Sequence, residues 1–300
     1  MTDGAMTINI LLGDFSVSAQ DADITVKSSD GFLFNLHSHN LGTNTGAFPG
    51  PEIGAQGEAV LLTEPANVLE IVFQFIYPRR HPKLDDLDFV ILMEVTEACE
   101  KYEVYSAMNM CEVRLNAFIS EHAAEIFVHA VKHGYPELID KTAILVCRFP
   151  VLNFVKTLPS YAVIPWLEYQ QAWRKIFDDA KIYLEDLLCG SYCHQYDACA
   201  DPDAQVYSDG RPICSQCRLS LLVWLQNLAE IEDITSLKDA VAAPNLVIYS
   251  YGPLGRWCKN CSNTCAIYLP EVKSILETRM TEIIPFTRFL YPTDRAPSAR

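Results

Sequence analysis

The sequence predicts an α+β domain, a small sheet flanked by helices, followed by a mostly α-helical domain. Two patterns predict this order: short runs rich in β-branched and aromatic residues lie between positions 23 and 62, and apolar residues recur at helical spacing from position 84 onward. A chain of 300 residues is long enough for two domains of about 150 residues each. The expected divisions are a flexible segment over 1–18, the first domain over 19–120, the helical domain over 121–292 and a flexible tail over 293–300.

The strongest local signal is a β-hairpin. Two strand-like runs, Asp23–Ser29 and Phe32–His37, flank an Asp30-Gly31 pair, and this dipeptide is typical of two-residue hairpin turns. A third strand is expected over Ala59–Leu62. The segment 40–46 is rich in Gly, which disfavours a conventional helix between the hairpin and the third strand.

A helix is expected directly after the third strand. Thr63 can cap its N-terminus, and Pro65 suits its first turn. Its apolar stripe needs a core and comprises Val68, Ile71, Val72 and Phe75. Asp85 and Asp86 complement the dipole at the start of the next helix. The remaining helices are expected over about 84–102, 107–121, 123–132, 137–147, 161–188, 213–230 and 271–284.

Composition excludes some classes of partner. The formal charge of −15 and pI near 4.8 oppose binding to nucleic acid, and the largest basic cluster is Arg79-Arg80-His81. No window approaches eighteen uninterrupted apolar residues, so no membrane partner is expected. The opening residues do not resemble a secretory signal. The eleven cysteines are therefore expected to be reduced thiols or metal ligands in an intracellular protein, cytoplasmic or nuclear.

Clustered cysteines in the second half predict a structural zinc site. One ligand set combines Cys189 and Cys193 with Cys214 and Cys217, and the other combines Cys214 and Cys217 with Cys258 and Cys261. Close Cys pairs allow two thiolates to reach one ion, and a second pair completes the tetrahedron. The alternative is that these are free thiols, with Cys217 in the core.

Other chemistry-bearing residues have simpler interpretations. Asp23 and His37 could form an acid–base pair, but no nucleophile or second carboxylate accompanies them, which favours structural roles. No nucleotide-binding fingerprint or nucleophile elbow is present, so no catalytic residue is predicted. Three cysteines on apolar helix faces are expected in the core: Cys99, Cys111 and Cys147. The four tryptophans are expected to be packing anchors: Trp166, Trp173, Trp224 and Trp257.

Several features of the first 120 residues follow one another in a characteristic order: Asp23 before the first strand, the Asp-Gly hairpin, the Phe-x-Phe-x-x-His pattern ending at His37, Leu41, Phe48, and the runs Val60–Pro65, Phe73–Pro78, Ala98–Tyr102 and Cys111–Phe118. With these features, residues of about 20–120 resemble the BTB/POZ family. The longer arrangement, with His129-Ala130, His133-Gly134 and the helical half that contains Trp and Cys, resembles the BTB-domain proteins of mushroom-forming fungi.

The resemblance implies a non-enzymatic protein–protein interaction module that pairs with itself or recruits another protein. It implies structural roles for Asp23 and His37. Alternatives are a substrate adaptor that binds a cullin in a ubiquitin ligase, a transcription regulator, or an enzyme in the helical half. The acidic charge disfavours the transcription regulator.

Overall fold

The computed structural model describes residues 21–48, 59–150, 152, 155–186, 215–243 and 259–292. The chain divides into two compact units, Met1–His122 and Ala123–Arg300, and the division falls two residues after the boundary expected from the sequence. The segments expected to be flexible, 1–18 and 293–300, lie outside the described residues. The described residues are mostly helical, with one small three-stranded sheet.

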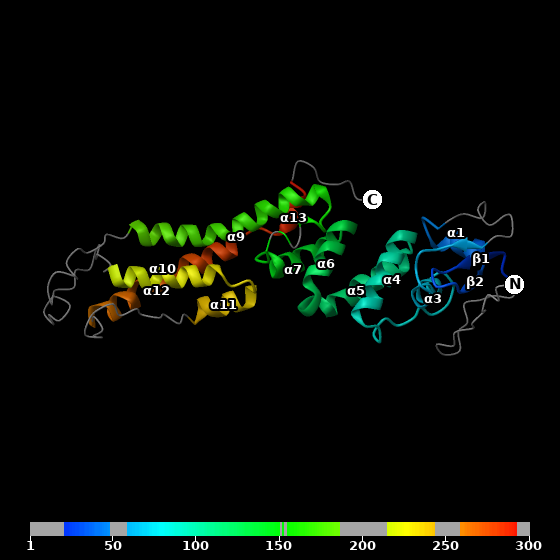
Figure 1. Ribbon diagram of the computed structural model, residues 1–300, viewed down its shortest axis with the longest axis horizontal. Coiled ribbons are helices and arrows are strands. Elements are labelled where there is room, and N and C mark those ends of the chain that lie inside the picture. Colours follow the sequence, from blue (N-terminus) through cyan, green and yellow to red (C-terminus); the bar gives the residue numbers. More distant parts are fainter. Residues whose placement is uncertain are drawn as a thin grey trace. The chain divides into compact units, whose positions relative to one another are not determined.

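The sheet of the first unit is built on the predicted hairpin, which the structure confirms (Figure 1). Strands β1 (Ile24–Lys27) and β2 (Leu33–Leu36) pair in antiparallel fashion, and β3 (Val60–Leu61) pairs in parallel with β1. The strand order is therefore β2-β1-β3. Gly31 in the turn has a φ of +93°, a conformation that glycine adopts without strain.

Helices follow the strands and supply most of the first unit's core. Their bounds are Ser38–Asn44 for α1, Ala66–Gln74 for α3, Phe89–Tyr102 for α4 and Tyr105–Leu115 for α5, followed by the short 3₁₀ helix η1 over Asn116–Phe118. Helix α3 packs on α4, and α4 packs on α5. The predicted core cysteines Cys99 and Cys111 are fully buried between these helices, which confirms that interpretation.

The predicted starts of α3 and α4 are wrong, because the residues that accept hydrogen bonds from the first N–H groups of these helices differ from those expected. The backbone N–H of Ala66 donates to Asp30, 3.1 Å away on the hairpin turn, whereas Thr63 Oγ1 donates to Glu64 instead of capping α3. Helix α4 begins at Phe89 because Asp88 accepts a hydrogen bond from the Ile91 N–H. Asp85 and Asp86 consequently precede the helix rather than open it.

Helix α6 (Ile119–His133) contains the division between the units. Its backbone leaves helical geometry at His122, where φ is −128° and ψ is 32°. It ends at His133, and the following Gly134 has a φ of +80°, the left-handed conformation common after a helix C-terminus. The N–H groups of Gly134 and Tyr135 both donate to the Ala130 carbonyl, at 2.8 and 3.0 Å.

The described residues of the second unit form helices joined by short connections, and none of them lies in a strand. After α6 come α7 (Pro136–Val146), α9 (Ser160–Asp186), α10 (Ser215–Ala229), α11 (Ile234–Ala242), α12 (Lys259–Glu282) and α13 (Phe286–Leu290). The predictions of α7 and α9 are confirmed to within two residues. Helix α12 begins twelve residues before the predicted start at Glu271, while α11 and α13 were not predicted.

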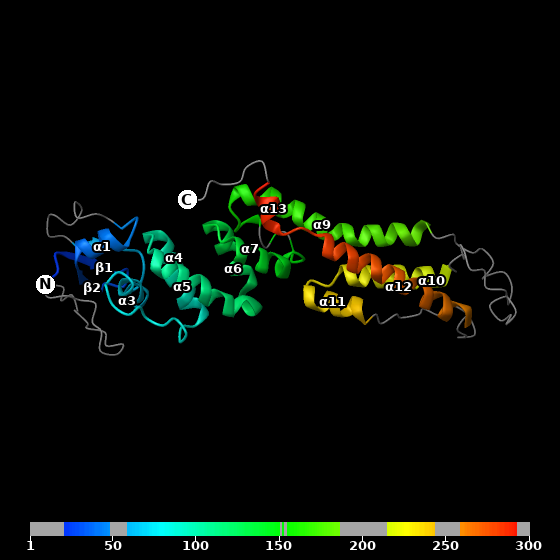
Figure 2. The same ribbon diagram turned by 180° about the vertical axis from the view of Figure 1, so that it is seen from behind.

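Aromatic residues fill the core of the second unit. The ring centroid of Trp166 lies 4.6 Å from that of Phe127 and 5.3 Å from that of Phe286, which joins α9 to α6 and α13. Helices α9, α10 and α12 run side by side (Figure 2). Trp166, Trp173 and Trp224 are buried, as predicted, whereas Trp257 lies outside the described residues. Among the described helices, none has the length and apolarity needed to cross a membrane.

Candidate functional site

The two polar positions expected to be structural, Asp23 and His37, lie at the start of α1. The Asp23 carboxylate accepts hydrogen bonds from the Ser38 N–H at 2.7 Å and the Ser38 hydroxyl at 2.5 Å. These two bonds hold the pKa of Asp23 below its ordinary value. The His37 ring lies 3.2 Å from the Tyr77 hydroxyl through Nδ1 and 3.2 Å from Asp21 through Nε2. Both groups are therefore engaged in holding the hairpin to α1 and to the segment after α3.

A second polar cluster joins the segment before α3 to the end of α4. Glu64 accepts hydrogen bonds from Lys101 at 2.7 Å and from the Tyr102 hydroxyl at 2.5 Å. Burial by itself raises the pKa of Glu64, but the hydrogen bonds from Lys101, Tyr102 and Thr63 outweigh burial and lower it. Burial and the carboxylate of Glu64 raise the pKa of Tyr102. This cluster keeps a carboxylate ionised inside the fold.

Large apolar side chains are exposed on three elements of the first unit. Leu61 on β3 is 74% exposed, Val90 on α4 is 63% exposed and Val113 on α5 is 75% exposed. Strand β3 also lies at one edge of the three-stranded sheet. An edge strand offers unpaired backbone groups to another chain. These side chains and this edge are the surface features of the described first unit that suit contact with a polypeptide.

The buried thiols of Cys99 and Cys111 form a pair between α4 and α5. The two side chains are hydrogen-bonded to each other, and this bond together with burial raises the pKa of Cys99 well above its ordinary value. Burial likewise raises the pKa of the Cys147 thiol to about 12. None of these three side chains is more than 2% exposed. The hydrogen bond with Cys99 outweighs burial at Cys111 and lowers the pKa of that thiol. Cys99 and Cys147 are therefore packed, protonated thiols.

The predicted zinc ligands fall mostly outside the described residues, and the zinc site stays a prediction. Cys189, Cys193, Cys214 and Cys258 lie outside them; Cys217 and Cys261 lie in the first turns of α10 and α12, of which the backbone is described. Helices α10 and α12 pack against each other, and their first turns lie at the same end of the bundle as the last turn of α9 (Figures 1 and 2).

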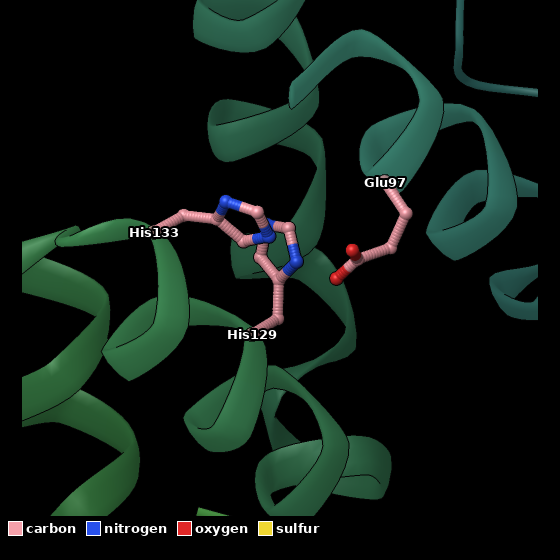
Figure 3. Close-up of side chains that lie close together, drawn as sticks. All are labelled: Glu97, His129 and His133. Atoms are coloured by element: carbon pink, nitrogen blue, oxygen red, sulfur yellow. The ribbon is translucent and has the colours of Figure 1, made fainter. Parts of the chain in front are cut away.

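A histidine pair that was not predicted to bind a ligand lies on α6. His129 and His133 project from the same side of the helix (Figure 3), and their ring centroids are 4.6 Å apart. His129 is 2% exposed, and the Tyr135 ring stacks on it at 5.9 Å with an interplanar angle of 17°. Glu97, also drawn in Figure 3, belongs to α4 in the first unit. The available signal was the spacing of four residues, with His129 in the helix expected over 123–132 and His133 directly after it.

These features differ in what they can do chemically. Asp23, His37 and Glu64 are bound by neighbouring groups of the first unit, and such contacts stabilise a fold. The exposed apolar residues suit binding, and adjacent imidazoles suit a transition metal. Comparison of the chain with known protein families, with curated proteins and with solved structures found no significant match.

Proposed function

We propose that the first unit is a BTB/POZ-type protein-interaction module and that the chain acts by binding polypeptides, in the first instance a second copy of itself. The observation that carries the proposal is the order of elements. An antiparallel hairpin, a short helix, a strand parallel to the first, and then α3 and the α4–α5 pair follow one another. This order fits the small sheet flanked by helices that the sequence resemblance implies.

The contacts of the polar residues support a binding role without catalysis. Asp23 and His37 make hydrogen bonds that close the hairpin onto α1, as described above. A general acid or base must instead reach a proton on a bound substrate. The roles of these two side chains are therefore structural in the proposal.

The surface available for contact also supports it. Leu61 lies at the sheet edge, and Val113 lies on α5, each with about three quarters of its side chain exposed. Burying an apolar side chain of this size against a partner stabilises a complex by about 1.5–3 kcal/mol. Replacing either residue with a charged one should therefore weaken an interface that includes it.

Light scattering coupled to size-exclusion chromatography tests the proposal on the full-length chain. We expect a mass of twice 33.7 kDa that falls toward 33.7 kDa on dilution. The variants Leu61→Glu and Val113→Glu should shift this equilibrium toward the single chain. Ile284→Glu is the matched control, because Ile284 is 51% exposed and lies in the second unit.

The outcome that contradicts self-association is a mass of one chain at every concentration. A dimer that dissociates equally in the Ile284→Glu control would place the contact outside the first unit. Both results would remove the support for this module as the binding element.

A further inference from the structure

His129 and His133 are placed by the helix itself. Side chains four positions apart lie one above the other on one face of an α-helix. The two rings are consequently neighbours, with centroids 4.6 Å apart and planes inclined by 42°. A ring nitrogen of each lies within 4.8 Å of the other (Figure 3). The two imidazoles therefore each bring one possible ligand nitrogen to a common region.

The end of α6 fixes the orientation of this pair. Gly134 takes a left-handed conformation, and the Tyr135 N–H returns to the Ala130 carbonyl at 3.0 Å. This turn carries the Tyr135 ring back over His129, where the two rings are nearly parallel. The last turn of a helix also carries partial negative charge, which favours a cation there. The positions of the His129 and His133 rings and the partial negative charge at the C-terminus of α6 both suit a bound cation.

We propose that His129 and His133 form a binding site for a divalent transition-metal ion of the imidazole-binding class, namely Zn²⁺, Ni²⁺ or Cu²⁺. Imidazole nitrogen is a common ligand for all three ions. Two nitrogens at bond lengths of about 2.0–2.1 Å stand roughly 3.3 Å apart in tetrahedral geometry.

The number of protein ligands determines how tightly the site holds an ion. Structural zinc sites use four protein ligands, whereas this pair supplies two and leaves the other positions for water or a small anion. Binding is therefore reversible and weaker than at a four-cysteine site. An ion that binds only the folded chain stabilises it, and the gain in free energy of unfolding grows with the logarithm of the free ion concentration once this exceeds the dissociation constant. Both histidines belong to the second unit.

Metal titration of tag-free, full-length protein tests the proposal. Accessible thiols are first alkylated with N-ethylmaleimide, so that cysteines do not compete for the ion. Ni²⁺ binding is then followed by calorimetry in the wild type, His129→Gln, His133→Gln and the control His39→Gln, which removes an exposed helical histidine. We expect His129→Gln and His133→Gln to weaken binding about tenfold or more and the control to leave it unchanged.

A spectroscopic readout assigns the ligands independently of affinity. Co²⁺ held by imidazoles shows d–d bands, whereas thiolate ligation adds an intense charge-transfer band. Wild-type affinity in His133→Gln, or a bound ion whose spectrum carries the thiolate band, overturns the proposal. His133 is half-buried, so this variant decides the matter if circular dichroism shows that His129→Gln does not fold.

Discussion

In the first unit, carboxylates join segments that are distant in sequence: Asp30 bonds to the N–H of Ala66, and Glu64 bonds to Tyr102. In the second unit, rings from three helices meet instead, with Trp166 between Phe127 and Phe286. Hydrogen bonds to ionised groups depend on pH, whereas packing depends on volume. The two units should therefore respond to different perturbations.

The chain carries separate reporters for the two units. All four tryptophans lie after residue 160, so tryptophan fluorescence follows the second unit. Cys99 and Cys111 lie in the first unit and are fully buried, so their labelling by a thiol reagent follows its unfolding. The three substitutions below use these reporters to separate the effects.

The largest effect is expected from Trp166→Ala. Trp166 has no exposed surface and contacts aromatic rings from α6 and α13, so its removal leaves a cavity in the core of the second unit. Truncations of this kind lower the free energy of unfolding by about 3–5 kcal/mol. Urea unfolding followed by the fluorescence of the remaining tryptophans measures the loss. The control Ile164→Ala, at a position 61% exposed on the same helix, should cost about 0.5 kcal/mol or less.

An intermediate effect is expected from Glu64→Gln. The substitution removes a carboxylate that accepts hydrogen bonds from Lys101 and Tyr102, and we expect it to cost about 1–2 kcal/mol at neutral pH. Labelling of Cys99 and Cys111 should accelerate, while the fluorescence transition should stay in place. Equal shifts of both reporters would contradict the separation of the units.

The pH dependence of this effect follows from the lowered pKa of Glu64 in the folded chain. A carboxyl with a depressed folded pKa contributes stability above its unfolded pKa of about 4.3, and the contribution is lost as the pH falls through the folded value. The wild type and Glu64→Gln should therefore converge in stability under acid. A difference that persists below both pKa values would disprove this assignment.

The smallest effect, and one of opposite sign, is expected from Glu70→Gln. Glu70 lies on α3 and is 4% exposed, and its Oε2 accepts no hydrogen bond from the described residues. Burial raises its pKa, so the folded chain loses stability as the pH rises from the unfolded pKa through the raised value. The neutral glutamine should stabilise the first unit at pH 7 by about 0.5 kcal/mol, after allowance for solvent screening. Slower labelling of Cys99 would report the gain.

Elements with local signals could be predicted from the sequence. The Asp30-Gly31 pair specified the hairpin because its turn requires a positive φ at Gly31. The apolar periodicity of 137–147 and 161–188 located α7 and α9. Long-range contacts could not be predicted in this way. Asp30 caps α3 from 36 positions away, and Asp23 caps α1 despite the low helix propensity of Gly42.

The cysteine site could be proposed from local sequence signals, whereas the histidine pair and the exposed apolar residues depend on how the chain packs. Cysteine spacing is a one-dimensional signal, so the sequence could propose ligand sets from Cys189 to Cys261. The histidine pair became apparent only with the end of α6, where Gly134 and Tyr135 fix the surroundings of His129. Exposure of Leu61 and Val113 also required the packing to be known, because an expected strand or helix does not by itself show which of its side chains other elements cover.

The position of Phe286 has a consequence for the order of events during synthesis. Its ring is fully buried and contacts Phe127, Trp166 and Tyr169, and Thr287 bonds to Asp140 at 2.9 Å. The residues that Phe286 and Thr287 contact are all synthesised more than 100 positions earlier. The core formed by α6, α7 and α9 therefore stays incomplete until α13 has been synthesised. A nascent chain halted before Pro285 would leave the apolar side chains that Phe286 covers exposed to chaperones.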